Sequence, residues 1–245
     1  MQREARKTHH SADGVDYWLE RKAVKNVNLR IHADGSVHVS APAHVSQARI
    51  DAFVASKARW IAQRQASFEA RAAEAPRAWC TGEQIRLWGE TLELRMERAS
   101  STRTESVTRE GAELVLRVAD RWSDSSEASA AHREKLVTRW LNEQLSAALP
   151  DLFARHETQM GVHAGAIRLR RMKTRWGSCK VAAAVITLNT ELVHYPPCCL
   201  ESVVVHELCH LIEPSHNARF HALQDRYYPA WREARKLLNA RPPVG

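Results

Sequence analysis

The sequence predicts an α+β protein in which a β-rich N-terminal region precedes a region of long helices. Short segments of alternating apolar and polar residues, separated by glycine-containing turns, run from residue 15 to residue 122. After residue 126, apolar residues recur every three or four positions, as they do on one face of a helix. With 245 residues, 44% of them hydrophobic and 26% charged, the chain can bury a normal core.

Three segments are expected along the chain. Residues 1–14 are polar and predict a flexible tail, and they hold no apolar stretch that would make a secretory signal. Residues 15–122 form the β-rich N-terminal region with one long helix, and residues 126–245 form a second domain. The boundary is placed at the polar stretch 123–126, because small polar residues there interrupt the apolar pattern.

Turn and capping residues set the expected elements. Asp34-Gly35 predicts a hairpin and Ser46 a helix N-cap, so the first part reads as a β-meander interrupted by one helix that Pro76 ends. Pro150 is expected to end the next long helix. The expected strands cover 15–20, 28–32, 37–41, 85–88, 92–96, 114–118, 167–172 and 185–188. A further apolar helix is expected from about residue 200 to residue 212, by its hydrophobic run.

Two features bear on the compartment. No apolar run approaches the roughly 18–20 residues needed to cross a bilayer, so no membrane partner is expected. The five cysteines are odd in number and irregularly spaced, which does not fit a disulfide framework. Without a secretory signal, reduced thiols predict a cytoplasmic protein.

The most informative motif is HELCH at 206–210, inside the expected apolar helix. Residues four apart share one helix face, so His206 and His210 can present two imidazoles to one metal ion. Glu207 is rotated by about 100 degrees from His206 and lies beside the metal, where a base for metal-activated water belongs. Two imidazoles and a carboxylate would be costly to bury in an apolar helix without a metal. The motif therefore predicts a metal-dependent hydrolytic centre.

A third protein ligand is expected, because catalytic zinc sites use three ligands and leave one position open. His216 is the first candidate: it follows His210 at the gap found in the metzincin signature, and Pro214 can turn the chain back. His221 and Glu233 remain as alternatives. Zinc suits three nitrogen ligands, although manganese, iron, cobalt or nickel could occupy the same site.

The charge of +8 favours an anionic partner, which includes nucleotides and nucleic acid. Part of the excess lies just before the metal motif and could bind phosphates. The cations concerned are Arg168, Arg170, Arg171, Lys173, Arg175 and Lys180.

Four motifs in fixed order resemble a known family. They are MKTRWGSC at 172–179, ITLNTEL at 186–192, HELCH at 206–210 with His216 and Phe220, and PAW at 229–231. Together they resemble the YgjP-type predicted metal-dependent hydrolases, relatives of the SprT-like zincins, and upstream matches extend the resemblance over most of the chain. The resemblance implies a zincin-like metallopeptidase core at 126–245, with an active-site helix on a small sheet. It also implies His206, His210 and His216 as ligands and Glu207 as the catalytic residue.

Two further residues are substrate-binding candidates. Arg175 could hold a carboxylate, a phosphate or the oxyanion of the transition state. Asn189 follows the expected strand 185–188, a candidate sheet edge for an extended peptide, but it could equally satisfy local backbone groups. Gly177 is expected to permit a tight turn.

Three functions are compatible with these features. The first is a zinc metallopeptidase acting on a peptide or protein, with Glu207 as general base. The second keeps the metal but changes the substrate, giving a phosphohydrolase of nucleotides or a protease that acts on DNA-bound proteins. The third is a metal-stabilised binding module without activity, against which the intact Glu207 argues. The sequence favours the first and predicts no oligomeric state.

Overall fold

The computed structural model describes residues 7–32, 34–72 and 77–240. The chain divides into two compact units, Met1–Pro76 and Arg77–Gly245, which are described separately. The described residues include no helix that combines the length and the apolar character needed to cross a membrane. The α+β class and the β-rich N-terminal region are confirmed.

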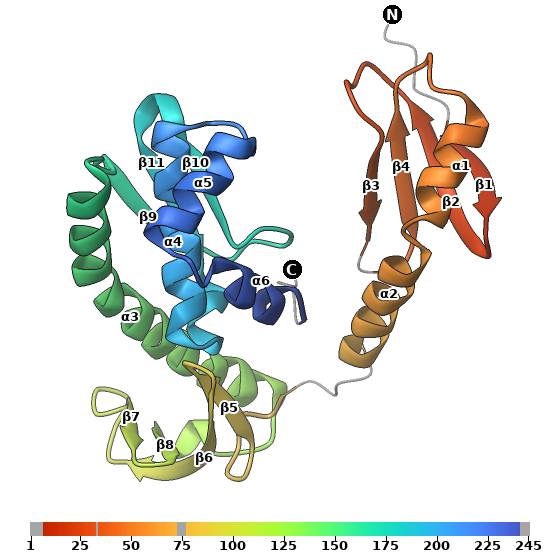
Figure 1. Cartoon of the computed structure of the whole chain (residues 1–245). Coiled ribbons are helices and arrows are strands. Elements are labelled where there is room, and N and C mark those ends of the chain that lie inside the picture. Colours follow the sequence, from red (N-terminus) through yellow and green to blue (C-terminus); the bar gives the residue numbers. More distant parts are fainter. Residues whose placement is uncertain (1–6, 33, 73–76, 241–245) are drawn as a thin grey trace, which may run out of the picture. The chain divides into compact units, whose positions relative to one another are not determined.

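The first unit is a four-stranded sheet with two helices (Figure 1). Its strand order is β1-β2-β4-β3, and β2 and β4 are parallel neighbours in the middle. Alternate residues of β2 and β4, among them Tyr17, Leu19 and Val39, are buried against Ile50 and Val54 of the first helix. The elements are β1(Lys7–Ala12), β2(Val15–Arg21), β3(Asn28–Ile31), β4(Val37–Ala41), α1(Gln47–Ala55) and α2(Ala58–Ala72).

Three details of this unit differ from the sequence prediction. β1 lies inside the expected flexible tail, because Asp13 and Gly14 take positive φ angles of 49° and 74° and close a two-residue hairpin that pairs β1 with β2. The sheet is not a meander, because two hairpins lie side by side and join through a parallel pair. The expected single helix is interrupted after Ser56.

The second unit contains two sheets and four helices. Its elements are β5(Gln84–Leu87), β6(Glu90–Ala99), β7(Ser106–Glu110), β8(Glu113–Ala119), α3(Glu127–Met160), β9(Ala166–Arg170), β10(Gly177–Lys180), β11(Val185–Asn189), α4(Pro197–Ile212), α5(Ala218–Tyr227) and α6(Trp231–Ala240). Short 3₁₀ helices connect some of them, including η3(Thr190–His194). The sheet β5-β6-β8-β7 repeats the pairing scheme of the first unit, with a parallel pair in the middle.

Helix α3 is one continuous helix, whereas the sequence predicted an end at Pro150. Proline in a helix interior costs about 3 kcal/mol. Leu145 and Leu149 before the proline and Leu152 and Phe153 after it are all buried, so both halves pack on the same core. Burying a side chain of this kind stabilises by about 1.5–3 kcal/mol, which outweighs the cost of the proline.

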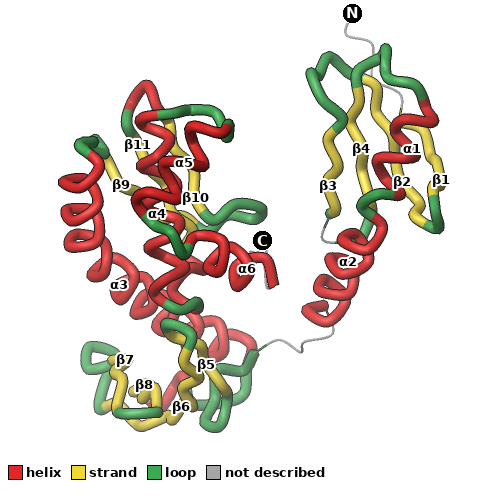
Figure 2. The backbone as a smooth tube through the Cα atoms, in the orientation of Figure 1, coloured by secondary structure: helices red, strands yellow, loops and turns green. Residues whose placement is uncertain are grey.

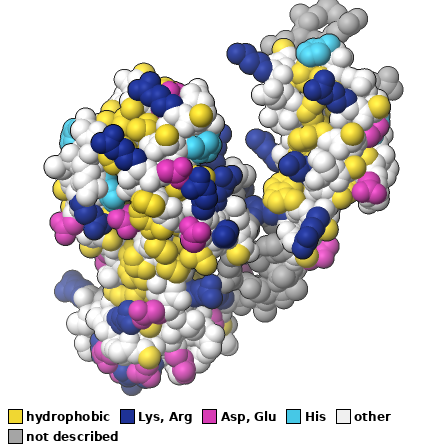
Figure 3. All heavy atoms as spheres, viewed as in Figure 1, with side chains coloured by type: hydrophobic (Ala, Val, Ile, Leu, Met, Phe, Trp, Pro, Cys, Tyr) yellow, Lys and Arg dark blue, Asp and Glu magenta, His cyan; other side chains and the backbone are white. Residues whose placement is uncertain are grey.

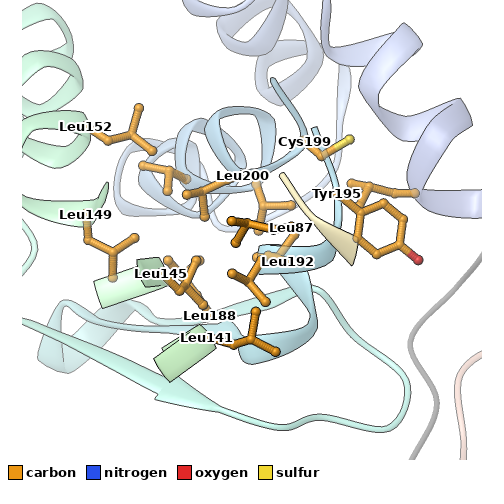
Figure 4. Close-up of a cluster of buried hydrophobic side chains, with 14 of the residues drawn as sticks. Leu87, Leu141, Leu145, Leu149, Leu152, Leu188, Leu192, Tyr195, Cys199 and Leu200 are labelled. Atoms are coloured by element: carbon orange, nitrogen blue, oxygen red, sulfur yellow. The ribbon is translucent and has the colours of Figure 1, made fainter. Parts of the chain in front are cut away.

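The division of the chain falls at 76/77 instead of the expected 123–126. Figure 4 shows the reason: Leu87 of β5 packs in the same cluster as Leu141 and Leu145 of α3, Leu188 of β11 and Leu200 of α4. A separate contact joins the β5–β6 turn to the start of α4, where a Cβ on Gly89 would lie 2.8 Å from Pro196. The sheet β5–β8 therefore shares one core with the helices that follow it.

The third sheet, β10-β11-β9, positions the functional site. β11 is its central strand, antiparallel to β10 and parallel to β9. Ile186 and Leu188 are fully buried beneath α4, which lies against β10 and β11 (Figure 2). In the view of Figure 3, hydrophobic side chains of this unit gather between its upper part and the sheet β5–β8 at its lower end.

Candidate metal centre

Helix α4 carries the first two imidazoles. Pro196 and Pro197 start the helix, where a proline ring is pre-set for the first turn and a missing N–H is harmless. Val204 and Val205 are buried, so the helix is fixed against the core just before the motif. His206 follows directly, and His210 lies one turn further along the same face. Their ring centroids are 5.0 Å apart.

The segment after α4 brings in His216. Backbone at Glu213 is extended, which ends the helix, and Asn217 caps α5 by accepting a hydrogen bond from the Phe220 N–H. Between them, the loop turns back and places His216 Nε2 3.0 Å from His206 Nε2. One nitrogen from each of the three histidines lies within 4.8 Å of the others, so this group can hold a metal ion.

The donor set fits a tetrahedral transition metal. Two nitrogens at about 2.0–2.1 Å from one tetrahedral zinc are about 3.3 Å apart, close to the distance between His206 and His216. Burial, reinforced by the neighbouring histidines and Arg235, lowers the pKa of His206 to about 3, so the ring is neutral as a ligand must be. The amide of Gln224 lies 3.2 Å from His206 Nδ1 and can fix the orientation of this ring.

Phe220 forms the floor beneath the three rings. It is fully buried, and its ring centroid lies 4.9 Å from that of His206 and 4.7 Å from those of His210 and His216. A rigid apolar floor restricts how the imidazoles can rotate. Packing on Phe220 therefore helps to hold the three nitrogens close to one another.

Glu207 lies beside this group with its carboxylate buried. The residue is 4% exposed, and its Oε2 has no hydrogen-bond partner among the described residues. Burial raises the pKa of Glu207 to about 8, and the positive charge of Arg175 opposes this shift. This oxygen lies next to three histidine nitrogens that can bind a metal, and it can accept a hydrogen bond from a ligand or a water.

Gly177 explains how the carboxylate fits. A Cβ on this residue would lie 2.4 Å from Glu207 Oε1 and 2.8 Å from its Cδ. Gly177 belongs to β10 and is not among the glycines with positive φ, so the expected tight turn is not its role. Its missing side chain lets the Glu207 carboxylate lie against the strand.

Asn189 holds the loop that leads into β10. Its side chain is fully buried, and its amide donates to the carbonyls of Met172 and Arg175, both at 2.8 Å. Its Oδ1 accepts from the N–H groups of Met172 and Glu191, both at 3.2 Å. The amide has no capacity left for a substrate, so the local backbone role is the one the structure gives, and the substrate-binding assignment is corrected.

The site opens into a cleft of about 760 Å³ lined by β10, α4, α5 and α6. Arg175, in the loop before β10, and Arg235 of α6 both line the cleft, and both are exposed. Neither forms an ion pair with a carboxylate among the described residues. Arg175 thus lies where a substrate-binding residue is expected, whereas Arg235 was not singled out from the sequence.

The two alternative ligands lie outside the histidine group. The ring of His221 stacks on Trp231 with centroids 5.6 Å apart. Glu233 is exposed and pairs with Lys236 at 3.9 Å. His216 is the candidate that the structure brings together with His206 and His210.

The free edge beside the site is β10, and β11 is not an edge. β11 pairs with β10 on one side and β9 on the other, so the expected strand 185–188 has no free backbone groups for a peptide. Gly177, Ser178 and Cys179 of β10 line the cleft.

Two histidines and a buried glutamate on a helix packed against a small sheet, with a third histidine from the next loop, can hold a metal ion as a metal-dependent hydrolase requires. Comparison with known families agrees. The chain belongs to the YgjP-like family, whose model, described as YgjP-like, metallopeptidase domain, matches residues 25–241.

Other comparisons add less. Among solved structures, the chain is similar to the metallopeptidase zymogen abylysin of Pyrococcus abyssi, with 19% identity over 39% of this chain and 97% of that chain. The TM-score is 0.35, too low to bear on the fold. No curated protein matches the sequence.

Proposed function

We propose that this protein is a zinc-dependent peptidase in which His206, His210 and His216 hold the metal and Glu207 is the general base. The observation that carries the proposal is the free Oε2 of the buried Glu207 beside three converging imidazoles. A buried carboxylate oxygen without a hydrogen-bond partner costs free energy. At the wall of a cleft, a water or a substrate can supply the missing hydrogen bond. Membership of a metallopeptidase family supports the same reaction.

The protein's own groups handle the proton in this reaction. His206, His210 and His216 would hold a divalent metal, which when bound would supply a more acidic water, with a pKa towards about 7, and polarise the scissile carbonyl. Glu207, ionised once the positive charge of a bound metal offsets the effect of burial on its pKa, would accept a proton from the attacking water at Oε2 and deliver it to the nitrogen of the leaving amine. The absent side chain of Gly177 leaves the room in which the carboxylate lies against β10.

The free edge of β10 supports a peptide substrate. An extended peptide can pair with this strand through backbone hydrogen bonds, which fixes its direction independently of its side chains. Arg175 enters the cleft beside the start of β10 and can bind a carbonyl or carboxylate of the substrate. Zinc is the proposed metal, with manganese, iron, cobalt and nickel compared in the same assay.

The test is peptide cleavage by protein stripped of metal and reloaded with one equivalent of Zn²⁺, with the products of a peptide mixture identified by mass spectrometry. We expect cleavage only after reloading. Glu207→Gln keeps the size of the side chain but cannot take a proton, so its rate should fall by about 10²- to 10⁴-fold while metal content is kept.

Glu233→Gln is the matched control, because Glu233 is exposed and lies outside the histidine group. It should keep both metal and activity. Full activity in Glu207→Gln, or equal losses in the two variants, would contradict the role proposed for Glu207.

A second candidate function is hydrolysis of phosphoanhydrides. The observation that favours it is the pair Arg175 and Arg235, two guanidinium groups on the cleft without carboxylate partners among the described residues. Guanidinium groups bind phosphate oxygens in a two-pronged geometry. Phosphate or pyrophosphate release from nucleoside triphosphates by the zinc-loaded protein, without any peptide cleavage, would replace the first proposal by this one.

A further inference from the structure

The sheet β10-β11-β9 and the loop after β9 carry most of the excess positive charge of the chain. The 25 residues 166–190 contain six Lys and Arg and no Asp or Glu. The rest of the chain contains 30 Lys and Arg and 28 Asp and Glu, which nearly cancel. The net charge of +8 is therefore concentrated in one small sheet, and the metal centre does not use most of it.

Strand register places three of these cations on one face. Ile186 and Leu188 of β11 point towards α4 and are fully buried. Side chains alternate along a strand, so Thr187 points the other way, and Arg168 of β9 is its partner in register. Arg170 lies two residues further along on the same face, and Lys180 of β10 lies there too, opposite Val185.

The three cations on this face, Arg168, Arg170 and Lys180, are exposed and without ion-pair partners among the described residues. By contrast, Arg171 in the following loop is paired with Glu191 at 3.3 Å. With strands about 4.8 Å apart, the three cations occupy a patch roughly 10 Å wide.

We propose that this face binds the phosphate backbone of double-stranded nucleic acid. Three unpaired cations at close spacing on a flat surface fit a regular row of phosphates. The paired strand residues between the cations on this face are Val185, Thr187, Ser178 and Asn189. None of them is aromatic, so these strands lack the stacking platform that single strands need. The contact is independent of base sequence and stands apart from the proposed peptidase reaction, because none of the three cations lines the cleft of the metal centre.

The test is fluorescence anisotropy of a labelled DNA duplex of arbitrary sequence, titrated with the full chain from 50 to 200 mM salt. Three phosphate contacts predict a slope of log K against log salt of about −2.7, which is a loss of affinity of about 40-fold over this range. In Arg168→Glu/Arg170→Glu the slope should fall to about −1 or shallower. Arg168→Gln/Arg170→Gln, which removes the charges without reversing them, should lower the slope to about −1 and covers the case in which charge reversal disturbs folding.

The matched control is Lys57→Glu/Arg59→Glu. These two exposed cations of the first unit are also two residues apart in the sequence, and the substitutions change the net charge by the same amount. This variant should keep the slope of the unaltered protein. A slope near zero in the unaltered protein, equal losses in test and control variants, or displacement of the duplex by polyglutamate at equal charge concentration would each overturn the proposal.

Discussion

Gly177 shows how a residue without a side chain can decide the geometry of the site. The Glu207 carboxylate occupies the space in which any other residue would place its Cβ. The motif 206–210 predicts Glu207 from helix spacing, but no local pattern predicts that a glycine thirty residues earlier in the chain must lie against it. That contact depends on the pairing of β10 with β11, which is a long-range property.

Gly177→Ala should therefore impair catalysis more than metal binding. The added methyl would lie 2.4 Å from Glu207 Oε1, so the carboxylate must move. A displacement of about 1 Å at a reacting group can lower kcat by about 100-fold. The measurement is kcat of the zinc-loaded variant beside its metal content.

Gly165→Ala is the matched control, because its Cβ would meet a backbone oxygen at 3.3 Å, outside the site. It should keep kcat within about threefold, as expected for a change that leaves reacting groups in place. Unchanged kcat in Gly177→Ala would show that the position of the carboxylate does not limit the reaction.

At the scale of elements, most helices and strands could be predicted from the sequence, but which strands pair with one another could not. The spacing of apolar residues and the Gly-containing turns locate the hairpins β3–β4, β5–β6 and β7–β8, whereas the hairpin β1–β2 was missed because β1 lies in the expected tail. The parallel pairs β2–β4 and β6–β8 and the central place of β11 join segments that local patterns cannot relate. At Pro150 the local signal predicts a helix end that the structure does not have, because the tertiary packing of α3 outweighs the cost of the proline.

Helix α3 is connected to the segments around it by one buried side chain, Arg133. It is fully buried in α3 and donates to the carbonyl of Ala78 at 2.8 and 3.0 Å, and to those of Trp122 and Asp124 at 2.5 and 2.9 Å. It thus ties the first described residues of the second unit to the loop before α3. All of its partners are neutral carbonyls.

Arg133→Met should lower the free energy of unfolding by about 3 kcal/mol, because three part-buried carbonyls lose their charged donor. Urea unfolding followed by circular dichroism is the measurement. Arg139→Met, on the same helix with a side chain 64% exposed, should change stability by less than about 0.5 kcal/mol. Equal effects of the two substitutions would refute the anchoring role of Arg133.

At the scale of the whole molecule, the two four-stranded sheets have the same pairing scheme but belong to different cores. The first unit has its own small core around Tyr17 and Leu19. The second sheet instead packs on α3, so a boundary drawn at the polar stretch 123–126 would cut through a core.

Two fragments test this division. Residues 77–245 should unfold in one cooperative transition and bind one metal ion. Residues 126–245 lack β5–β8, so buried α3 side chains such as Leu136 and Val137 lose their covering strands, and the fragment should lack a cooperative transition. Calorimetry of both fragments is the measurement, and cooperative unfolding of 126–245 would favour the boundary at 123–126.

The central claim is that His206, His210 and His216 together hold one metal ion. X-ray absorption at the zinc edge, on protein reloaded with one equivalent of Zn²⁺, measures the ligand set directly. The structure predicts three imidazole nitrogens at about 2.0–2.1 Å and the same spectrum in Glu207→Gln, with loss of one imidazole in His216→Ala. A sulfur neighbour at about 2.3 Å, or a spectrum unaffected by His216→Ala, would contradict this metal centre.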